Sequence, residues 1–301
     1  MICPVCKTSI VNSKHIWKYE FSEIIQCNFC GVVHHVRNST LYKEQVFATY
    51  SKNSWGNFNK EDYDSNLASV QIAQHADRMK FNLQFFQEFI SFDNKKSILD
   101  IGAGIGLLEF IVEQTNEKLA DMNFVLLEPI AENYQILRER YSNYVVLNGH
   151  LEEYENIESV YDVIFCQGVD YLFNDIDKSF SLLHRLLKDD GLLFISRNVF
   201  IDMPCYFGGE KIDTLQKLFS PNPLINIFFL ETHYREFLEK NFEILSSKEY
   251  LEKYGKGLAV GKSYNYVLKK KSLIYDQSAI MNQDFKEVYD IAIQKLSVNK
   301  K

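Results

Sequence analysis

The ten residues Ser97-Ile-Leu-Asp-Ile-Gly-Ala-Gly-Ile-Gly106 decide the fold of this chain. Ile98, Leu99 and Ile101 form a short apolar run typical of a buried parallel strand, and the apolar segment that begins at Leu107 is compatible with a helix. Three glycines turn the chain between them, where a nucleoside can approach a backbone that carries no Cβ atom. The stretch therefore predicts a strand-to-helix turn that ends on a nucleoside ligand.

The spacing of Gly102, Gly104 and Gly106 separates this loop from a dinucleotide-binding loop. A dinucleotide loop follows G-x-G-x-x-G, so that its third glycine opens a helix against a pyrophosphate. Here the pattern is D-x-G-x-G-x-G, with Asp100 two residues before the first glycine. A carboxylate at that position repels a pyrophosphate but suits a ligand with an ammonium group. Another nucleotide site, or tight helix-to-strand packing alone, is the alternative at this point.

The pattern resembles motif I of the class I S-adenosylmethionine-dependent methyltransferases, and the downstream segments are similar to that family in order and spacing. The resemblance covers roughly residues 62–270. It implies an α/β, Rossmann-like domain with a seven-stranded, mostly parallel sheet and helices on both faces. It also implies S-adenosylmethionine as the cofactor and methyl transfer as the activity. Strands after the first one are expected at 124–128, 144–148, 161–166, 191–196 and 264–269.

The resemblance implies cofactor-binding residues at the carboxyl ends of these strands. Glu128 ends the second strand, where one carboxylate can accept hydrogen bonds from both ribose hydroxyls. His150 stands where the family usually has an acid, so the backbone of Leu151 and the acid of Glu152 are the expected adenine contacts. Gln167 directly follows the fourth strand. The expected cofactor-binding set is Asp100, Gly102, Gly104, Gly106, Glu128, Leu151, Glu152 and Gln167.

Two C-x-x-C pairs near the start of the chain predict a metal site. Cys3 and Cys6 form the first pair, Cys27 and Cys30 form the second, and twenty residues separate the pairs, as in tetrathiolate zinc sites. Four cysteines leave no open position for water, so the predicted Zn²⁺ is structural and lets a zinc-ribbon module fold. The alternatives are two disulfides, four unrelated thiols, or His34 or His35 in place of one cysteine.

Length and composition agree with one small module and one large domain. The chain has 301 residues, and 46% of them are hydrophobic, which is ample for a core. No apolar run approaches the roughly 20 residues of a membrane span. We therefore expect a soluble, cytoplasmic protein without a membrane partner, and the oligomeric state is left open. The expected parts are a zinc-ribbon module at 1–45, a linker at 46–61, the methyltransferase domain at 62–270 and a helical tail at 271–301.

The distribution of charge bears on the choice between a small molecule and a nucleic acid as partner. The net charge of −7 is uneven. Residues 1–60 hold seven Lys or Arg and three Asp or Glu, a net charge of +4, which leaves −11 for the remainder. Four thiolates around one Zn²⁺ would add about −2 to the first segment. A large basic surface for nucleic acid is therefore not expected.

The catalytic residues are the least constrained by the sequence. Relatives with an N-terminal zinc-binding module often place Glu-His after the fourth strand, and here Asp170 and Tyr171 occupy those positions. Asn198, after the fifth strand, is a candidate for orienting an acceptor hydroxyl, and His233 resembles a histidine of the late substrate segment. We rank His233 first and Tyr171 second as proton acceptors, and a packing role for each is the alternative.

Residues 199–235 are expected to cover the acceptor cleft, because so long an irregular connection in a compact domain usually serves a function. The predicted reaction is methyl transfer from S-adenosylmethionine to a small polar acceptor, such as a nucleotide-linked sugar or another surface-polysaccharide precursor. One alternative is an RNA base methyltransferase whose zinc ribbon holds the nucleic acid. The other is a protein that binds the cofactor without catalysis.

Overall fold

A computed structural model of the 301-residue chain gives the fold, and every structural statement below refers to the residues that it describes. These residues are 3, 6–9, 14–18, 22–29, 33–37, 70–90, 96–115, 121–154, 160–173, 175–197, 227–228, 231–250 and 263–271.

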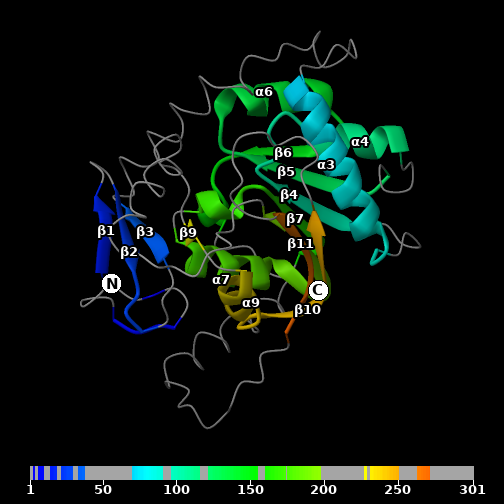
Figure 1. The fold of residues 1–301 in the computed structure, drawn as a ribbon. Helices are drawn as coiled ribbons and strands as arrows, with labels where there is room; N and C mark the ends of the chain where they lie inside the picture. Colours follow the sequence, from blue (N-terminus) through cyan, green and yellow to red (C-terminus); the bar gives the residue numbers. More distant parts are fainter. Residues whose placement is uncertain are drawn as a thin grey trace, which may run out of the picture. The chain divides into compact units, whose positions relative to one another are not determined.

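The central sheet has seven strands and is mostly parallel, as predicted. Its strands are β4 (Ser97–Ile101), β5 (Asn123–Glu128), β6 (Val145–Asn148), β7 (Tyr161–Gln167), β8 (Leu187–Arg197), β10 (Phe242–Tyr250) and β11 (Ser263–Lys270). They lie in the order β10-β11-β8-β7-β4-β5-β6 (Figure 1). Strands β6, β5, β4, β7 and β8 pair in parallel, whereas β11 pairs antiparallel with both β8 and β10. The late expected strand at 264–269 is this antiparallel β11.

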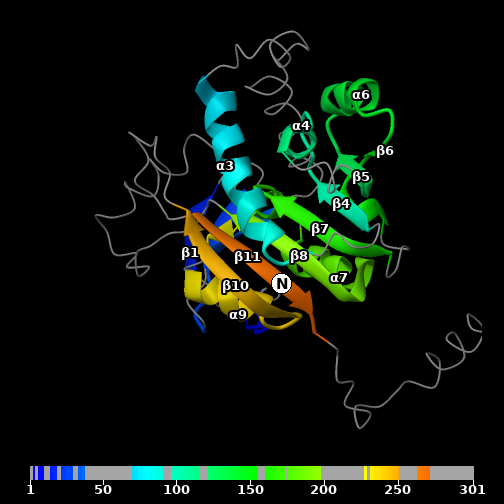
Figure 2. The same ribbon diagram turned by 90° about the vertical axis from the view of Figure 1, so that its right-hand side faces the viewer.

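Helices cover both faces of the central sheet (Figure 2). One face carries α3 (Val70–Gln87), α4 (Leu107–Thr115) and α6 (Ala131–Arg140), and the other carries α7 (Ile176–Leu186) and α9 (Glu231–Leu238). Two short 3₁₀ turns, η1 (Leu151–Tyr154) and η2 (Asp170–Leu172), follow β6 and β7. None of the helices in the described ranges is both long and apolar enough to cross a membrane.

Alternation along β4 divides its side chains between two apolar cores, one on each face of the sheet. Ile98 packs in the core under α3 and α4, and Leu99 and Ile101 pack in the core under α7 and α9. On the first face, the rings of Phe86 and Phe194 stack with centroids 4.4 Å apart. Because successive side chains of a strand point to opposite faces, Asp100 lies on the face covered by α3 and α4.

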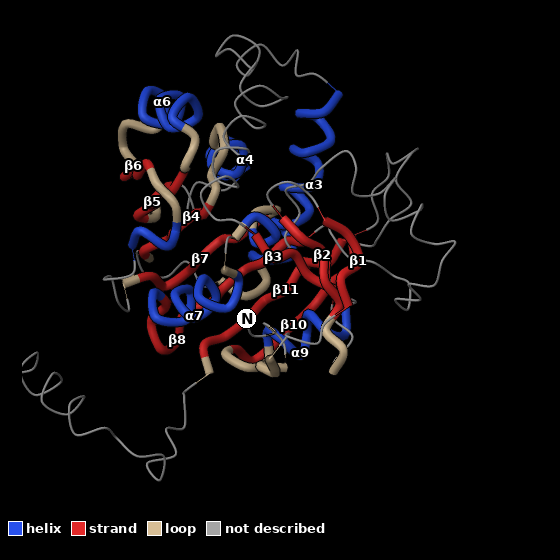
Figure 3. Tube along the Cα trace, turned by 90° about the vertical axis from the view of Figure 1, so that its left-hand side faces the viewer, coloured by secondary structure: helices blue, strands red, loops and turns tan. Residues whose placement is uncertain are grey.

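A second, antiparallel sheet contains the N-terminal strands. These are β1 (Lys14–Lys18), β2 (Ser22–Gln26) and β3 (Val33–Arg37), which lie side by side in Figure 3. The fourth strand is β9 (Ile227–Phe228), and the order is β1-β2-β3-β9. A strand of the predicted covering segment thus completes the N-terminal sheet, which the sequence did not predict. The predicted linker at 46–61 and the tail beyond residue 271 lie outside the described residues.

Candidate functional site

The loop between β4 and α4 has the backbone that its three glycines predict. Gly102, Gly104 and Gly106 have φ angles of +66°, +60° and +81°. A Cβ atom on Gly106 would lie 2.3 Å from the ring of Tyr141, whose hydroxyl donates a 2.7 Å hydrogen bond to the Gly106 carbonyl oxygen. A Cβ atom on Gly104 would meet no atom within 4 Å. Gly106 therefore permits close packing, whereas Gly104 borders open space.

Glu128 lies beside this loop, at the end of β5. Its Oε2 accepts a 2.8 Å hydrogen bond from the backbone N–H of Gly104. Its Oε1 accepts from the backbone N–H of Ile130 at 3.0 Å and from the side-chain amide of Asn133 at 3.3 Å. Burial raises the pKa of Glu128 to about 7, although these three donors lower it. The structure thus places the carboxylate at the glycine loop, and its ribose-binding role stays a prediction.

Asp100, also predicted as a cofactor residue, lies buried in β4 against an acid of α4. Its carboxyl group contacts that of Glu109. Burial raises the pKa of Asp100 well above its usual range, and the nearby charges of Glu109 and Glu128 raise it further. Glu109 was not predicted from the sequence as a site residue. The signal was present, because Glu109 is the one acid in the apolar run 107–112.

A row of polar side chains crosses the sheet at the carboxyl ends of its parallel strands. In register, Glu128 pairs with Asn148, Gln167 pairs with Ser196, and Ser196 pairs with Asn265. Side chains in register on neighbouring strands point to the same face, so Gln167, Ser196 and Asn265 lie together. All three are buried. The row shares the sheet face of α3 and α4 with Asp100.

Three buried amides join this row to α3. The Nδ2 of Asn265 donates to Oδ1 of Asn82 at 2.8 Å, and Nδ2 of Asn82 donates to Oε1 of Gln167 at 2.9 Å. At the two ends of this amide chain, Nε2 of Gln167 and Oδ1 of Asn265 have no hydrogen-bond partner among the described residues. A buried polar atom without a partner costs about 1–3 kcal/mol. The ends of the amide chain are therefore suited to bind a polar group.

Asn82 was not found from the sequence, although it is an amide between two apolar residues of what is helix α3. The residue after Gln167 also bears on the site. Gly168 has a φ angle of +69°, and a Cβ atom there would meet no atom within 4 Å. The next side chain, Val169, lies 2.5 Å from the position that a Cβ on Gly102 would take. The loop after β7 therefore packs against the glycine loop and also borders open space.

The two predicted adenine contacts lie in η1. Leu151 is buried in the core under α7 and α9. The Oε1 of Glu152 accepts a 2.7 Å hydrogen bond from the hydroxyl of Ser179 in α7. One carboxylate oxygen of Glu152 is thus bonded within the protein, and the adenine-binding roles of Leu151 and Glu152 stay predictions.

A hydrogen bond joins the two segments that hold the first-ranked catalytic candidates. The hydroxyl of Tyr234 in α9 donates to Oδ2 of Asp170 in η2 at 2.7 Å, and both residues are fully buried. His233 and Tyr171 are the sequence neighbours of this bonded pair. The side chains of His233 and Tyr171, and the whole of Asn198, lie outside the described part of the chain.

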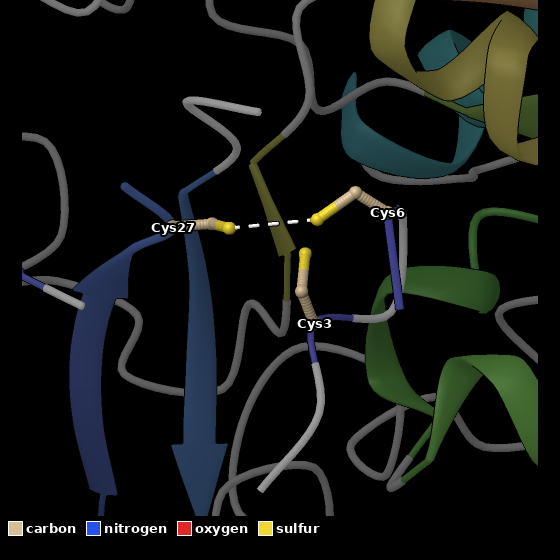
Figure 4. Close-up of side chains that lie close together, drawn as sticks. All are labelled: Cys3, Cys6 and Cys27. Atoms are coloured by element: carbon tan, nitrogen blue, oxygen red, sulfur yellow. Dashed lines mark hydrogen bonds between the residues drawn. The ribbon is translucent and has the colours of Figure 1, made fainter. Parts of the chain in front are cut away.

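Three of the four predicted metal ligands lie together in the N-terminal module (Figure 4). The Sγ atoms of Cys3, Cys6 and Cys27 are within 4.8 Å of one another, and those of Cys6 and Cys27 are 3.6 Å apart. No disulfide joins these three cysteines to one another. Sulfurs that bind one Zn²⁺ at about 2.3 Å in a tetrahedron lie about 3.8 Å apart. The three thiols therefore have a spacing that suits a tetrahedral metal, and Cys30 lies outside the described residues.

The residues around the glycine loop fit S-adenosylmethionine. Gly104 and Gly168 border open space that a side chain would fill. Asp100 and Glu109 are buried carboxyl groups, and neither oxygen of Glu109 has a hydrogen-bond donor of normal geometry among the described residues. A ligand that carries positive charge matches such a site better than a pyrophosphate does. The donor set thus agrees with the ammonium-bearing cofactor that the loop pattern predicts.

Comparisons with known proteins agree with this site. Residues 99–195 match the family model of a methyltransferase domain. A search of curated proteins found no match. One similar structure comes from the complex between the Haloferax volcanii Trm112 methyltransferase activator and a putative methyltransferase. That chain is 12% identical, with 71% of this chain and 100% of that chain covered and a TM-score of 0.51.

Two further structures are similar to this chain. The MccD protein is 9% identical, with 64% of this chain and 96% of that chain covered and a TM-score of 0.51. An S-adenosylmethionine-dependent methyltransferase from Leishmania major is 20% identical over 76% of this chain and 80% of that chain, with a TM-score of 0.48. The fold, the glycine loop and the family match lead to one conclusion. Residues 99–195 form a methyltransferase domain within this fold.

Proposed function

We propose that this enzyme methylates a small acceptor that carries hydroxyl groups, with a nucleotide-linked sugar as the leading candidate. The amide chain Asn265–Asn82–Gln167 is the observation that carries the proposal. Its Gln167 end adjoins Gly168, which borders open space next to the glycine loop. A polar group of an acceptor bound there would lie close to the cofactor, and it would use a buried atom of Gln167 that lacks a partner.

A hydroxyl group suits the Gln167 end better than other groups do. If one of the three side-chain amides is flipped, so that its nitrogen and oxygen exchange places, the other two must be flipped as well. Each hydrogen bond of the chain needs one donor and one acceptor, so it fixes the orientation of the next amide. In one orientation of the three amides Gln167 offers an N–H group at its open end, and in the flipped orientation it offers a carbonyl oxygen. A hydroxyl both donates and accepts, so it bonds to Gln167 in either orientation. An apolar acceptor would leave this atom without a partner.

The chain's own residues are then proposed to align the acceptor and to remove its proton. When bound, S-adenosylmethionine supplies an electrophilic methyl group on a sulfonium ion. His233 and Tyr171 are the proposed proton acceptors, and Asn198 is proposed to orient the acceptor hydroxyl. The hydrogen bond between Tyr234 and Asp170 supports this assignment, because it links α9, which contains His233, to η2, which contains Tyr171.

The cofactor and metal assignments are part of the same proposal. We infer that Asp100, Glu128 and the glycine loop hold S-adenosylmethionine, with Gln167 at the methyl end and Leu151 and Glu152 at the adenine end. We also propose one structural Zn²⁺ held by the four cysteines of the two C-x-x-C pairs. The separation of 3.6 Å between the sulfurs of Cys6 and Cys27 supports the metal site.

Labelled cofactor distinguishes the candidate acceptors. The purified full chain is incubated with methyl-labelled S-adenosylmethionine and with separate pools of sugar nucleotides and of total RNA. We expect label in the sugar-nucleotide pool, and a sharp loss of it in His233→Ala or Tyr171→Phe. Label only in RNA would support the RNA methyltransferase, and label in neither pool would support binding without catalysis.

Salt dependence of RNA binding provides a second readout. An RNA enzyme with roughly six to ten phosphate contacts loses on the order of a thousandfold or more in affinity between about 50 and 200 mM salt. The chain beyond residue 60 has a net charge of −11, so we expect no such salt-sensitive binding. Steeply salt-dependent binding to RNA would contradict the choice of a small acceptor.

A further inference from the structure

Glu109 is a buried acid that the proposed chemistry has not yet used. It lies in the first turn of α4, and its exposed fraction is 0%. Neither of its carboxyl oxygens forms a hydrogen bond of normal geometry with a donor in the described ranges. Isolated buried carboxylates are strongly unfavourable, and buried acids normally have a cation or several donors beside them. Glu109 therefore needs either a proton or a positively charged partner.

The groups that face Glu109 are also acidic or neutral. Its carboxyl group contacts that of Asp100 from β4, and Glu128 from β5 acts on Asp100 as a further negative charge. Within α4, the charge of Glu113 acts on Glu109. Tyr144, just before β6, is buried nearby, and burial followed by the charges of Glu113 and Glu109 raises its pKa to about 12. Arg140 of α6 lies over the ring of Phe110 in α4, and its charge acts on Glu113. None of the described groups that act most strongly on Asp100 or Glu109 is positively charged.

Two carboxyl groups in contact can form a hydrogen bond only when one of them carries a proton. Burial raises the pKa of Glu109 to about 7, against the lowering effects of its own backbone N–H and of Asp100. Burial also raises the pKa of Asp100 well above its usual range. The directions of both shifts favour a pair that holds one proton, with a charge of −1 rather than −2.

We propose that Glu109 is a further residue of the cofactor site, which shares one proton with Asp100 and releases it when the ammonium group of an S-adenosyl ligand binds. This inference rests on the proposed cofactor site. The pair goes from a charge of −1 to −2, the proton leaves to solvent, and the ligand contributes the ammonium charge of +1. Because Asp100 in β4 contacts Glu109 in α4, ligand binding at Asp100 also changes the charge in the first turn of α4.

Calorimetry with S-adenosylhomocysteine tests the proposal, because this probe has the ammonium group but no methyl to transfer. Titrations at about pH 6.5 in buffers of equal pH and different ionisation enthalpy give the number of protons released. We expect release approaching one proton per ligand for the wild type. The dissociation constant should then fall as pH rises from 6 to 8, by up to about tenfold per pH unit.

Glu109→Gln isolates the shared proton, because its amide donates to Asp100 at every pH. We expect proton release lower than in the wild type by up to one proton per ligand and a dissociation constant that depends less on pH, with any remaining release coming from Glu128. Glu139→Gln, which removes an exposed acid of α6, is the matched control and should behave as the wild type does. Circular dichroism and thermal unfolding verify that each variant folds. If Glu109→Gln does not fold, Asp100→Asn replaces it with the same expectation for proton release.

The outcomes separate this inference from the proposed cofactor site. Binding of S-adenosylhomocysteine to the wild type without proton release would overturn the shared proton and leave the cofactor site intact. Equal proton release in Glu109→Gln and in the wild type would overturn the role of Glu109. Absence of binding to the wild type would refute the cofactor site and this inference together.

Discussion

At the scale of single residues, Gly104 and Gly106 lie in one loop and serve different purposes. Both have a positive φ angle, which costs an alanine about 1–2 kcal/mol. A Cβ on Gly106 also overlaps the ring of Tyr141, so Gly106→Ala should lose more stability, on the order of 3 kcal/mol. Gly104→Ala should lose less stability but at least tenfold in affinity for S-adenosylhomocysteine.

Urea unfolding and calorimetry on the two variants check this prediction. Each variant serves as the control for the other, because both carry the same backbone strain. Equal losses of stability, or unchanged ligand affinity in Gly104→Ala, would contradict the division of roles between the two glycines.

Glu128 makes stability depend on pH in the cofactor-free protein. Its pKa is raised from 4.5 to about 7, chiefly by burial, so the folded state holds this proton more tightly than the unfolded state does. The contribution of Glu128 to the free energy of unfolding therefore falls as pH rises from about 4.5 through 7. The loss is on the order of 3 kcal/mol once Glu128 is fully ionised. The melting temperature of Glu128→Gln relative to the wild type should increase between pH 5.5 and 8. A constant difference across that range would contradict this.

At the scale of elements, Asn82 ties α3 to β7 and β11. Asn82→Ala removes both bonds and leaves polar atoms of Gln167 and Asn265 buried without partners. Each such atom costs about 1–3 kcal/mol, so we expect a loss of about 2 kcal/mol or more. Gln84→Ala, an exposed position on the same helix, is the control and should change stability little. Urea midpoints measure both, and similar values would show that the amide chain contributes nothing to the attachment of α3.

The pairing of β3 with β9 links the proposed metal to the segment before α9. Purified protein should contain about one zinc, and Cys27→Ser should lose it. Backbone hydrogen exchange should then increase in β9 as well as in β1–β3, because Val33 pairs with Phe228. Cys205→Ser, outside both C-x-x-C pairs, is the control. Retained zinc in Cys27→Ser, or an intramolecular disulfide in the fresh protein, would contradict the metal site.

The elements show what the sequence could and could not predict. Strand β5 and helix α4 follow from local patterns, namely an apolar run and a glycine turn, and they lie where these patterns place them. The pairing of β3 with β9 and the contact of Asn82 with Asn265 join residues far apart in the chain. No local propensity encodes such pairs. Glu109 could have been found only as an acid out of place in an apolar helix.

At the scale of the whole molecule, acidic side chains are buried together at the proposed cofactor site. Asp100, Glu109 and Glu128 are all buried around one glycine loop. Their mutual repulsion is relieved by protons in the cofactor-free protein and, by our inference, by the ligand's positive charge in the complex. The site would thus exchange a proton for the positive charge of the ligand when the cofactor binds.

The pairing of β3 with β9 also sets an order for assembly during protein synthesis. Nearly two hundred residues separate Arg37 from Phe228, so β3 is made long before the strand that covers its edge. At about 5–20 residues per second, that interval is on the order of 10–40 seconds. Throughout this time the N-terminal strands leave the ribosome with one edge unpaired, and such an edge can pair with another nascent chain. The first module of this protein is therefore among the last parts to be completed.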